Sequence, residues 1–176
     1  ISALGLSLTF GKWGYPLAIF FILAIINAIN LIDGIDGLAT GTSAIFFVTI
    51  TIIAVLLDRI YGLDVILCVI MLGACLGFLM YNKPPASIFL GDTGSTFLGF
   101  IIAIIALLGY KTATFTSLII PIFILLLPIL DTVFAMIRRY LKGENIGEPD
   151  KEHLHHQLLN LNKSTTKTVL IMYGID

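Results

Sequence analysis

The chain has 176 residues, of which 58% are hydrophobic and only 12% are charged, and its mean hydropathy is +1.03. This composition excludes an ordinary water-soluble domain and indicates a polytopic membrane protein. The net charge of −1 says little, because the charges of a membrane protein matter by the side of the bilayer on which they lie. We expect the membrane as a partner and no nucleic acid.

Apolar runs predict the transmembrane helices in chain order: residues 17–32, 42–57, 63–80, 96–108 and 118–137, with a sixth run starting near Thr168. A bilayer core needs about 20 helical residues, so the shorter runs must extend into their polar or Gly-rich flanks. The predicted fold class is an all-α, polytopic transmembrane helical bundle. The chain lacks an initiator Met and a basic leader, and it stops inside the sixth run. We expect residues 1–176 to be a single integral membrane domain, the C-terminal portion of a longer protein.

The polar connections alternate between the two sides of the membrane if each run crosses once. Residues 33–41, 81–95 and 138–167 then share one side, and residues 1–15, 58–62 and 109–116 share the other. Seven of the ten basic residues fall on the first side: Lys83, Arg138, Arg139, Lys142, Lys151, Lys163 and Lys167. Because positively charged loops tend to stay inside, we expect this face to be cytoplasmic in a multi-pass plasma-membrane protein.

The first polar segment, residues 27–41, follows a membrane-length apolar run. Asn27 and Asn30 are spaced i, i+3 on one helix face, and Asp33 and Asp36 follow, each before a glycine. Carboxylates and amides bind hard cations through oxygen, and glycines let the backbone approach a bulky anion. The alternative is a helix C-terminus that ends in an Asp-Gly turn. The segment predicts a metal-assisted site for a phosphorylated substrate.

The second polar segment, residues 82–95, places Gly91 and Gly94 on either side of Asp92, just before an apolar run. One interpretation is an ordinary helix N-cap. The same geometry favours phosphate binding, since a helix N-terminus offers unpaired N–H groups. The Asp-Thr-Gly-Ser string that starts at Asp92 also matches the aspartic-protease triplet, but that site needs paired carboxylates on a β scaffold.

The third polar segment, residues 138–167, is predicted to be a cytoplasmic loop that holds the histidines of the chain: His153, His155 and His156. They could be a chance cluster of solvated side chains. Zinc is weakly supported, because no cysteine or well-spaced fourth ligand accompanies them. Phosphate contact fits better, because imidazoles can donate to phosphate oxygens and Arg138 and Arg139 lie in the same loop.

Together these segments resemble one known family. Asn-x-x-Asn-x-x-Asp-Gly-x-Asp-Gly, then Phe-Leu-Gly-Asp-Thr-Gly-Ser, then His-x-His-His is similar to the polyprenyl-phosphate N-acetylhexosamine-1-phosphate transferases, of glycosyltransferase 4 type. The resemblance implies an all-helical fold of ten or eleven transmembrane helices, about six of them present here and the last truncated. It also implies transfer of a sugar phosphate from a UDP-sugar to a polyprenyl phosphate, usually undecaprenyl phosphate, with release of UMP and use of Mg²⁺, or alternatively Mn²⁺.

The resemblance also implies roles for individual residues. Asp92 is the best candidate for a Mg²⁺ ligand and Asn30 is the next. Asp33 and Asp36 match acidic positions of catalysis or nucleotide recognition. The remaining substrate contacts would come from Phe89 stacking on uracil, Asn82 at its edge, Asn27, and the three histidines assisted by Arg138 or Arg139 at the diphosphate.

One element of the family is absent from the chain: an Asp-Asp pair expected upstream of Ile1, where the nucleophile-activating base is proposed to lie. Residues 1–176 alone are therefore expected to be inactive. A homodimer is left open.

The third segment most resembles the branch that uses UDP-N-acetylglucosamine, for the first membrane step of teichoic-acid or O-antigen-type polymers. The alternative is phospho-N-acetylmuramoyl-pentapeptide transfer in peptidoglycan synthesis, whose branch more often has a continuous histidine triplet. A CDP-alcohol phosphatidyltransferase needs a wider Asp-Gly spacing and an Arg that this chain lacks. A transporter would place polar residues near the midplane, whereas here they lie at loop ends.

Overall fold

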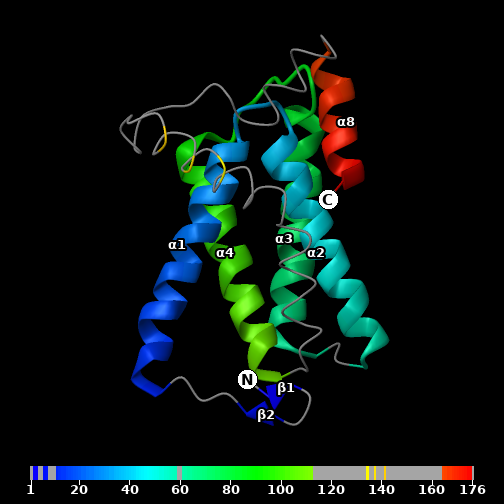
Figure 1. The fold of residues 1–176 in the computed structure, drawn as a ribbon. Helices are drawn as coiled ribbons and strands as arrows, with labels where there is room; N and C mark the ends of the chain where they lie inside the picture. The colour runs from blue at the N-terminus through cyan, green and yellow to red at the C-terminus, as the bar shows by residue number, and fades with distance from the viewer. Residues whose placement is uncertain are drawn as a thin grey trace.

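A computed structural model describes residues 2–3, 6–7, 11–58, 61–112, 134, 137, 141 and 164–175. The long helices are α1 (Gly14–Ile32), α2 (Leu38–Leu56), α3 (Leu63–Asn82) and α4 (Gly91–Thr112), and α8 (Thr165–Ile175) is shorter. A 3₁₀ turn, η1 (Gly11–Trp13), precedes α1. The long helices run side by side, and α8 lies along one end of them (Figure 1). The predicted all-α class is confirmed, with one small addition. Strands β1 (Ser2–Ala3) and β2 (Leu6–Ser7) form a two-stranded antiparallel ladder before the first helix.

The prediction of a polytopic membrane protein is confirmed by the described part of the chain. It contains four helices that are long and apolar enough to cross a membrane: Gly11–Ile32, Leu38–Leu56, Leu63–Asn82 and Gly91–Leu108. Helices suit this environment because every backbone N–H and C=O inside hydrocarbon must find a partner within the protein. Large apolar side chains such as Phe20 remain exposed on the outer face of the bundle, where lipid is their solvent. The predicted span at 118–137 falls almost entirely outside the described residues.

The helices end where their sequence can no longer continue them. After Ile32 the chain turns through residues 33–37, and Gly37 has a φ of +77°, a left-handed conformation that suits glycine. Helix α3 ends before Lys83-Pro84-Pro85, because proline restricts the residue before it to extended conformations. These two breaks create the short turn 33–37 and the longer connection 83–90.

Helix packing brings the two polar segments together. Helix α1 packs along α4, and α2 packs along α3. Where α1 meets α4, a Cβ on Gly99 would lie 2.7 Å from the Ile26 Cα, so only glycine lets the two backbones come this close. The buried core between the helices includes Ile25, Ile29, Phe46, Phe47, Cys68 and Ile102. This packing fixes the last turn of α1 beside the first turn of α4.

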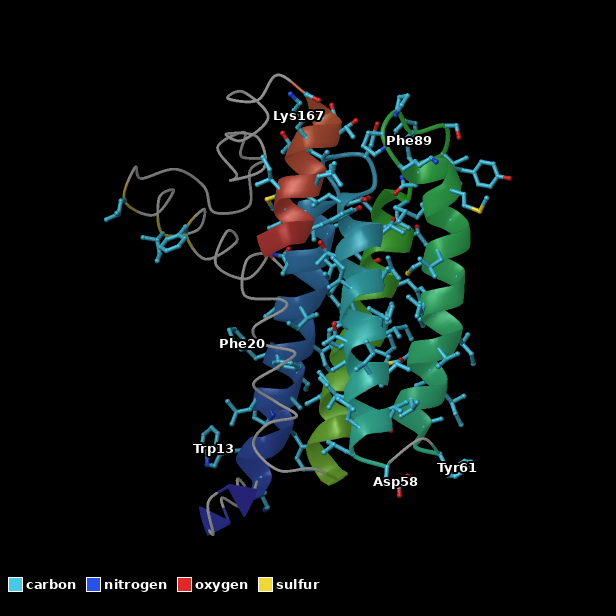
Figure 2. The ribbon with its side chains drawn as sticks, turned by 90° about the vertical axis from the view of Figure 1, so that its right-hand side faces the viewer. Trp13, Phe20, Asp58, Tyr61, Phe89 and Lys167 are labelled. Carbon is cyan, nitrogen blue, oxygen red and sulfur yellow. The ribbon has the colours of Figure 1, made fainter. Side chains whose placement is uncertain are left out.

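The two ends of the bundle differ in the way that alternation of the connections predicts. Phe89, in the connection between α3 and α4, lies at the same end as Lys167 in the first turns of α8 (Figure 2). Trp13, Asp58 and Tyr61 lie at the other end (Figure 2). The predicted convergence of residues 33–41 and 81–95 on one face is therefore confirmed. The histidine-containing loop lies outside the described residues.

Candidate active site

The site begins with an amide and a carboxylate from two neighbouring helices. The Asn30 amide donates to Asp92 Oδ1 at 3.3 Å and to Ser95 Oγ at 2.8 Å. Asn30 lies in the last turn of α1, whereas Asp92 lies in the first turn of α4. Ser95 is completely buried, and its hydroxyl oxygen holds the amide in place. The two residues predicted as metal ligands, 62 positions apart, are thus in direct contact.

A second carboxylate, that of Asp33, lies close enough to Asp92 to interact with its charge. Asp33 follows directly after α1 and is half-buried. Burial, and then the negative charge of Asp92, raise the pKa of Asp33 from 3.8 to about 6. Both effects penalise a second negative charge at this place. A bound cation would relieve that penalty, because an opposite charge within a few ångströms favours the ionised carboxylate.

Asp36 connects the two loops of the site. Its Oδ2 accepts a hydrogen bond from the backbone N–H of Ala86 at 3.0 Å. The turn 33–37 is thereby fixed to the connection 83–90, although 50 residues separate the two partners. A carboxylate has capacity for several donors, so this contact leaves Asp36 able to accept from a ligand as well.

Asn82 fixes the connection from its other side. Its Oδ1 accepts from the Thr40 hydroxyl at 2.9 Å, and its Nδ2 donates to the Ile88 carbonyl at 3.0 Å. The side chain is only 3% exposed. A side-chain amide has two N–H donors and two acceptor positions, and these bonds use one of each. Asn82 can therefore hold the loop and still contact a ligand.

These loops enclose a pocket of about 150 Å³. Seven residues line it: Asp33, Gly34, Ile35, Asp36, Asn82, Phe89 and Leu90. The Phe89 side chain is 73% exposed (Figure 2). It lies at the end of the bundle that holds residues 33–37 and 83–90, which we call the polar end. The pocket combines carboxylates, an amide and an accessible aromatic ring, which suits a planar polar ligand such as a nucleobase.

The oxygen donors suit a hard divalent cation. Asp92 and Asp33 supply carboxylates, and Asn30 would supply its amide oxygen after half a turn of the side chain, because its nitrogen now faces Asp92. Mg²⁺ is commonly held by one or two carboxylates together with water and substrate phosphate. Within the residues that the structure describes, no group of three His, Cys, Asp or Glu side chains could hold a metal. Two carboxylates, Asp33 and Asp92, interact electrostatically here, which is the number that Mg²⁺ commonly takes from a protein when water and phosphate supply its other ligands.

The remaining predicted site residues lie in α1 or outside the described part of the chain. Asn27 lies one turn before Asn30 in α1, with its side chain exposed. Five others lie outside the described residues: Arg138, Arg139, His153, His155 and His156.

Three polar side chains that hold the site were not predicted from the sequence. Ser95 could have been found, because it lies one helical turn after Asp92. Thr40 and Tyr173 could not, because their partners lie 42 and 136 residues away and no local pattern pairs them.

Residues 2–110 match the model of glycosyl transferase family 4. The match covers more than half of the chain, which therefore belongs to this family. The resemblance to this family is thus confirmed over a stretch that includes the first two polar segments.

Several curated proteins are similar to the chain. A probable undecaprenyl-phosphate N-acetylglucosaminyl 1-phosphate transferase of Bacillus subtilis is 49% identical over 94% of this chain and 46% of its own length. A decaprenyl-phosphate N-acetylglucosaminephosphotransferase of Mycolicibacterium smegmatis is 37% identical over 86% of this chain and 42% of its length. A phospho-N-acetylmuramoyl-pentapeptide-transferase of Chloroherpeton thalassium is 37% identical over 97% of this chain and 50% of its length. The chain spans about half the length of the curated relatives it matches.

Proposed function

We propose that residues 1–176 belong to an enzyme that transfers N-acetylglucosamine 1-phosphate from UDP-N-acetylglucosamine to undecaprenyl phosphate and releases UMP. The observation that carries this proposal is the meeting of Asn30, Asp33 and Asp92 beside a pocket with an exposed aromatic ring. The name of the Bacillus subtilis relative, at 49% identity, supports the same donor and acceptor.

The pocket would take the uridine part of the donor. Phe89 would stack on the uracil ring, as aromatic side chains do on nucleobases. Asn82 and Asp36 would bond the edge of the base or the ribose hydroxyls, because one offers an amide and the other a carboxylate at the pocket wall. The diphosphate would then extend toward Asp92.

Asp92, Asp33 and Asn30 would hold Mg²⁺. Bound there, the ion would offset the negative charge on the diphosphate oxygens, including those around the phosphorus under attack. The chain's own contribution is to keep these oxygens together. Ser95 accepts a hydrogen bond from the Asn30 amide, and the packing of α1 against α4 keeps Asp92 within reach of Asn30. The arginines and histidines of residues 138–167 would bind the phosphates.

We propose that this end of the bundle faces the cytoplasm, where UDP-sugars are available. The support is the bias of basic residues, seven of ten, toward the connections that alternation along the chain predicts for this side. The apolar helices would keep the lipid acceptor in the bilayer while its phosphate reaches the polar end.

The test is release of UMP by a full-length protein that includes residues 1–176, in detergent with undecaprenyl phosphate. We expect turnover with UDP-N-acetylglucosamine that needs both the lipid phosphate and Mg²⁺. UDP-N-acetylmuramoyl-pentapeptide is run in parallel, since one relative at 37% identity has the pentapeptide transferase name. Preferential use of the pentapeptide donor would replace our proposal with that activity, and transport without UMP release would refute the enzyme altogether.

A further inference from the structure

One side chain from the far end of the chain contacts the backbone of the candidate site. The Tyr173 hydroxyl, in α8, donates to the Gly37 carbonyl oxygen at 2.6 Å. The same oxygen also accepts from the Gly41 N–H at 2.8 Å, in the first turn of α2. A carbonyl oxygen has two lone pairs, so both bonds can form together. Gly37 closes the turn that carries Asp33 and Asp36.

The surroundings of Tyr173 are shaped for it. Helix α8 packs on α2 (Figure 1), with Val169 and Met172 buried on its inner face. A Cβ added at Gly41 would overlap the phenol of Tyr173, so the ring occupies space that only a glycine leaves open. The Tyr173 hydroxyl therefore reaches the turn across the surface of α2, at the place where Gly41 has no side chain.

Gly37 is held between two neighbours. On one side lies the Tyr173 hydroxyl, and on the other lies the start of the 83–90 connection. A Cβ on Gly37 would come within 3.4 Å of the Asn82 carbonyl oxygen and the Lys83 Cα. Its φ of +77° adds strain for any other residue. A shift of this carbonyl would move the turn relative to Phe89 and Asn82 on the opposite pocket wall.

We propose that Tyr173 is a positioning residue for the donor pocket, which it sets by fixing the Gly37 carbonyl. Tyr173 is not among the residues that line the pocket, so it acts through the turn and not on the substrate. The inference rests on the proposed function only for the identity of the donor. The contact itself holds whatever nucleotide the pocket takes.

The kinetic test uses Tyr173→Phe in the full-length protein. This change keeps the ring in its gap and removes only the hydroxyl. We expect the KM for UDP-N-acetylglucosamine to rise about two- to tenfold, the effect of one neutral hydrogen bond, with a smaller change in kcat. The KM for undecaprenyl phosphate should stay unchanged. Tyr61→Phe is the matched control, because Tyr61 is 90% exposed at the opposite end (Figure 2).

A second variant, Gly41→Ala, attacks the same contact from the other side. The added Cβ displaces the Tyr173 ring, so we expect a larger rise in the KM for the donor than Tyr173→Phe gives. Combining the two changes should add little, since both remove one interaction. Full additivity of the two effects would contradict a shared mechanism.

Hydrogen–deuterium exchange tests the contact independently of the substrate. Residues 33–41 should exchange faster in Tyr173→Phe than in the wild type, because the turn loses one of its anchors. Unchanged exchange, or faster exchange with an unchanged KM for the donor, would overturn the proposal. A wild-type protein that fails to use UDP-N-acetylglucosamine would refute the proposed function and leave the exchange result to decide on Tyr173.

Discussion

The two ends of the helix bundle are built differently. At the end away from the candidate site, the turn after α2 is closed by backbone hydrogen bonds from the Leu57 N–H to the Ile53 carbonyl and from the Asp58 N–H to the Val55 carbonyl. Asp58 and Tyr61 there are exposed. At the polar end, side-chain hydrogen bonds join separate helices and loops: Asp36 to Ala86, Asn82 to Thr40 and Ile88, and Tyr173 to Gly37.

This difference shows what each end has to do. Local backbone bonds such as those donated by Leu57 and Asp58 can close a turn that reverses the chain. Long-range side-chain bonds cost conformational entropy, and a site that must hold groups in a fixed geometry justifies them. We therefore expect substitutions at the polar end to change activity and equivalent substitutions at the other end to leave it alone.

The largest effect is expected for Asp92→Asn. The change removes the central carboxylate of the proposed metal site but keeps the size of the side chain and an amide that can pair with Asn30. At the Mg²⁺ concentration used for the wild type, the rate of UMP release should fall by about a hundredfold to a thousandfold. This is the range for loss of one strong electrostatic contact to a reacting group. Asp58→Asn, at the opposite end, is the control and should stay within about twofold, since the residue is exposed and far from the site. Retained activity of Asp92→Asn would count against a ligand role.

A smaller effect is expected for Phe89→Ala. Loss of base stacking costs about 1–3 kcal/mol, which corresponds to a rise of about five- to 150-fold in the KM for the UDP-sugar. The measurement is the KM for UDP-N-acetylglucosamine, compared with Phe20→Ala, which removes an equally exposed ring from the outer face of α1. Equal KM values for Phe89→Ala and the wild type would exclude stacking on the donor.

The sequence predicted the parts of this comparison that depend on short-range pattern. Apolar run length predicted the four described long helices, because the bilayer imposes that length on any span. Alternation of the connections predicted that Asn30 and Asp92 lie at one end, although it could not predict that they touch. Their contact depends on how closely α1 and α4 pack, which Gly99 decides.

The sequence could not predict the bonds that hold the pocket walls. Asp36 was predicted from its type and position, but its bond to Ala86 depends on a loop conformation that no periodicity encodes. Thr40 and Tyr173 look like ordinary helix residues in the sequence. Only the packing of α2 against α3 and α8 shows that their hydroxyls reach the site loops.

The smallest effect is expected for Thr40→Val, because Thr40 does not line the pocket and only holds Asn82, which does. The change keeps the shape of the side chain and removes the hydroxyl that donates to Asn82 Oδ1 at 2.9 Å. Both residues are buried, so the amide oxygen loses a partner that water cannot replace, at a cost of about 1–3 kcal/mol. We expect a lower thermal midpoint in detergent and a rise in the KM for the UDP-sugar below that of Phe89→Ala.

Thr51→Val is the matched control for this change within the same helix. The Thr51 hydroxyl donates only locally, to the Phe47 carbonyl one turn earlier at 2.8 Å, and that carbonyl keeps its place in the helix when the hydroxyl is removed. Thr51→Val should therefore leave both the thermal midpoint and the KM close to the wild type. If the two threonine variants behaved alike, the Thr40–Asn82 bond would be a feature of packing with no bearing on the pocket, and the polar end would be held by Asp36 and Tyr173 without it.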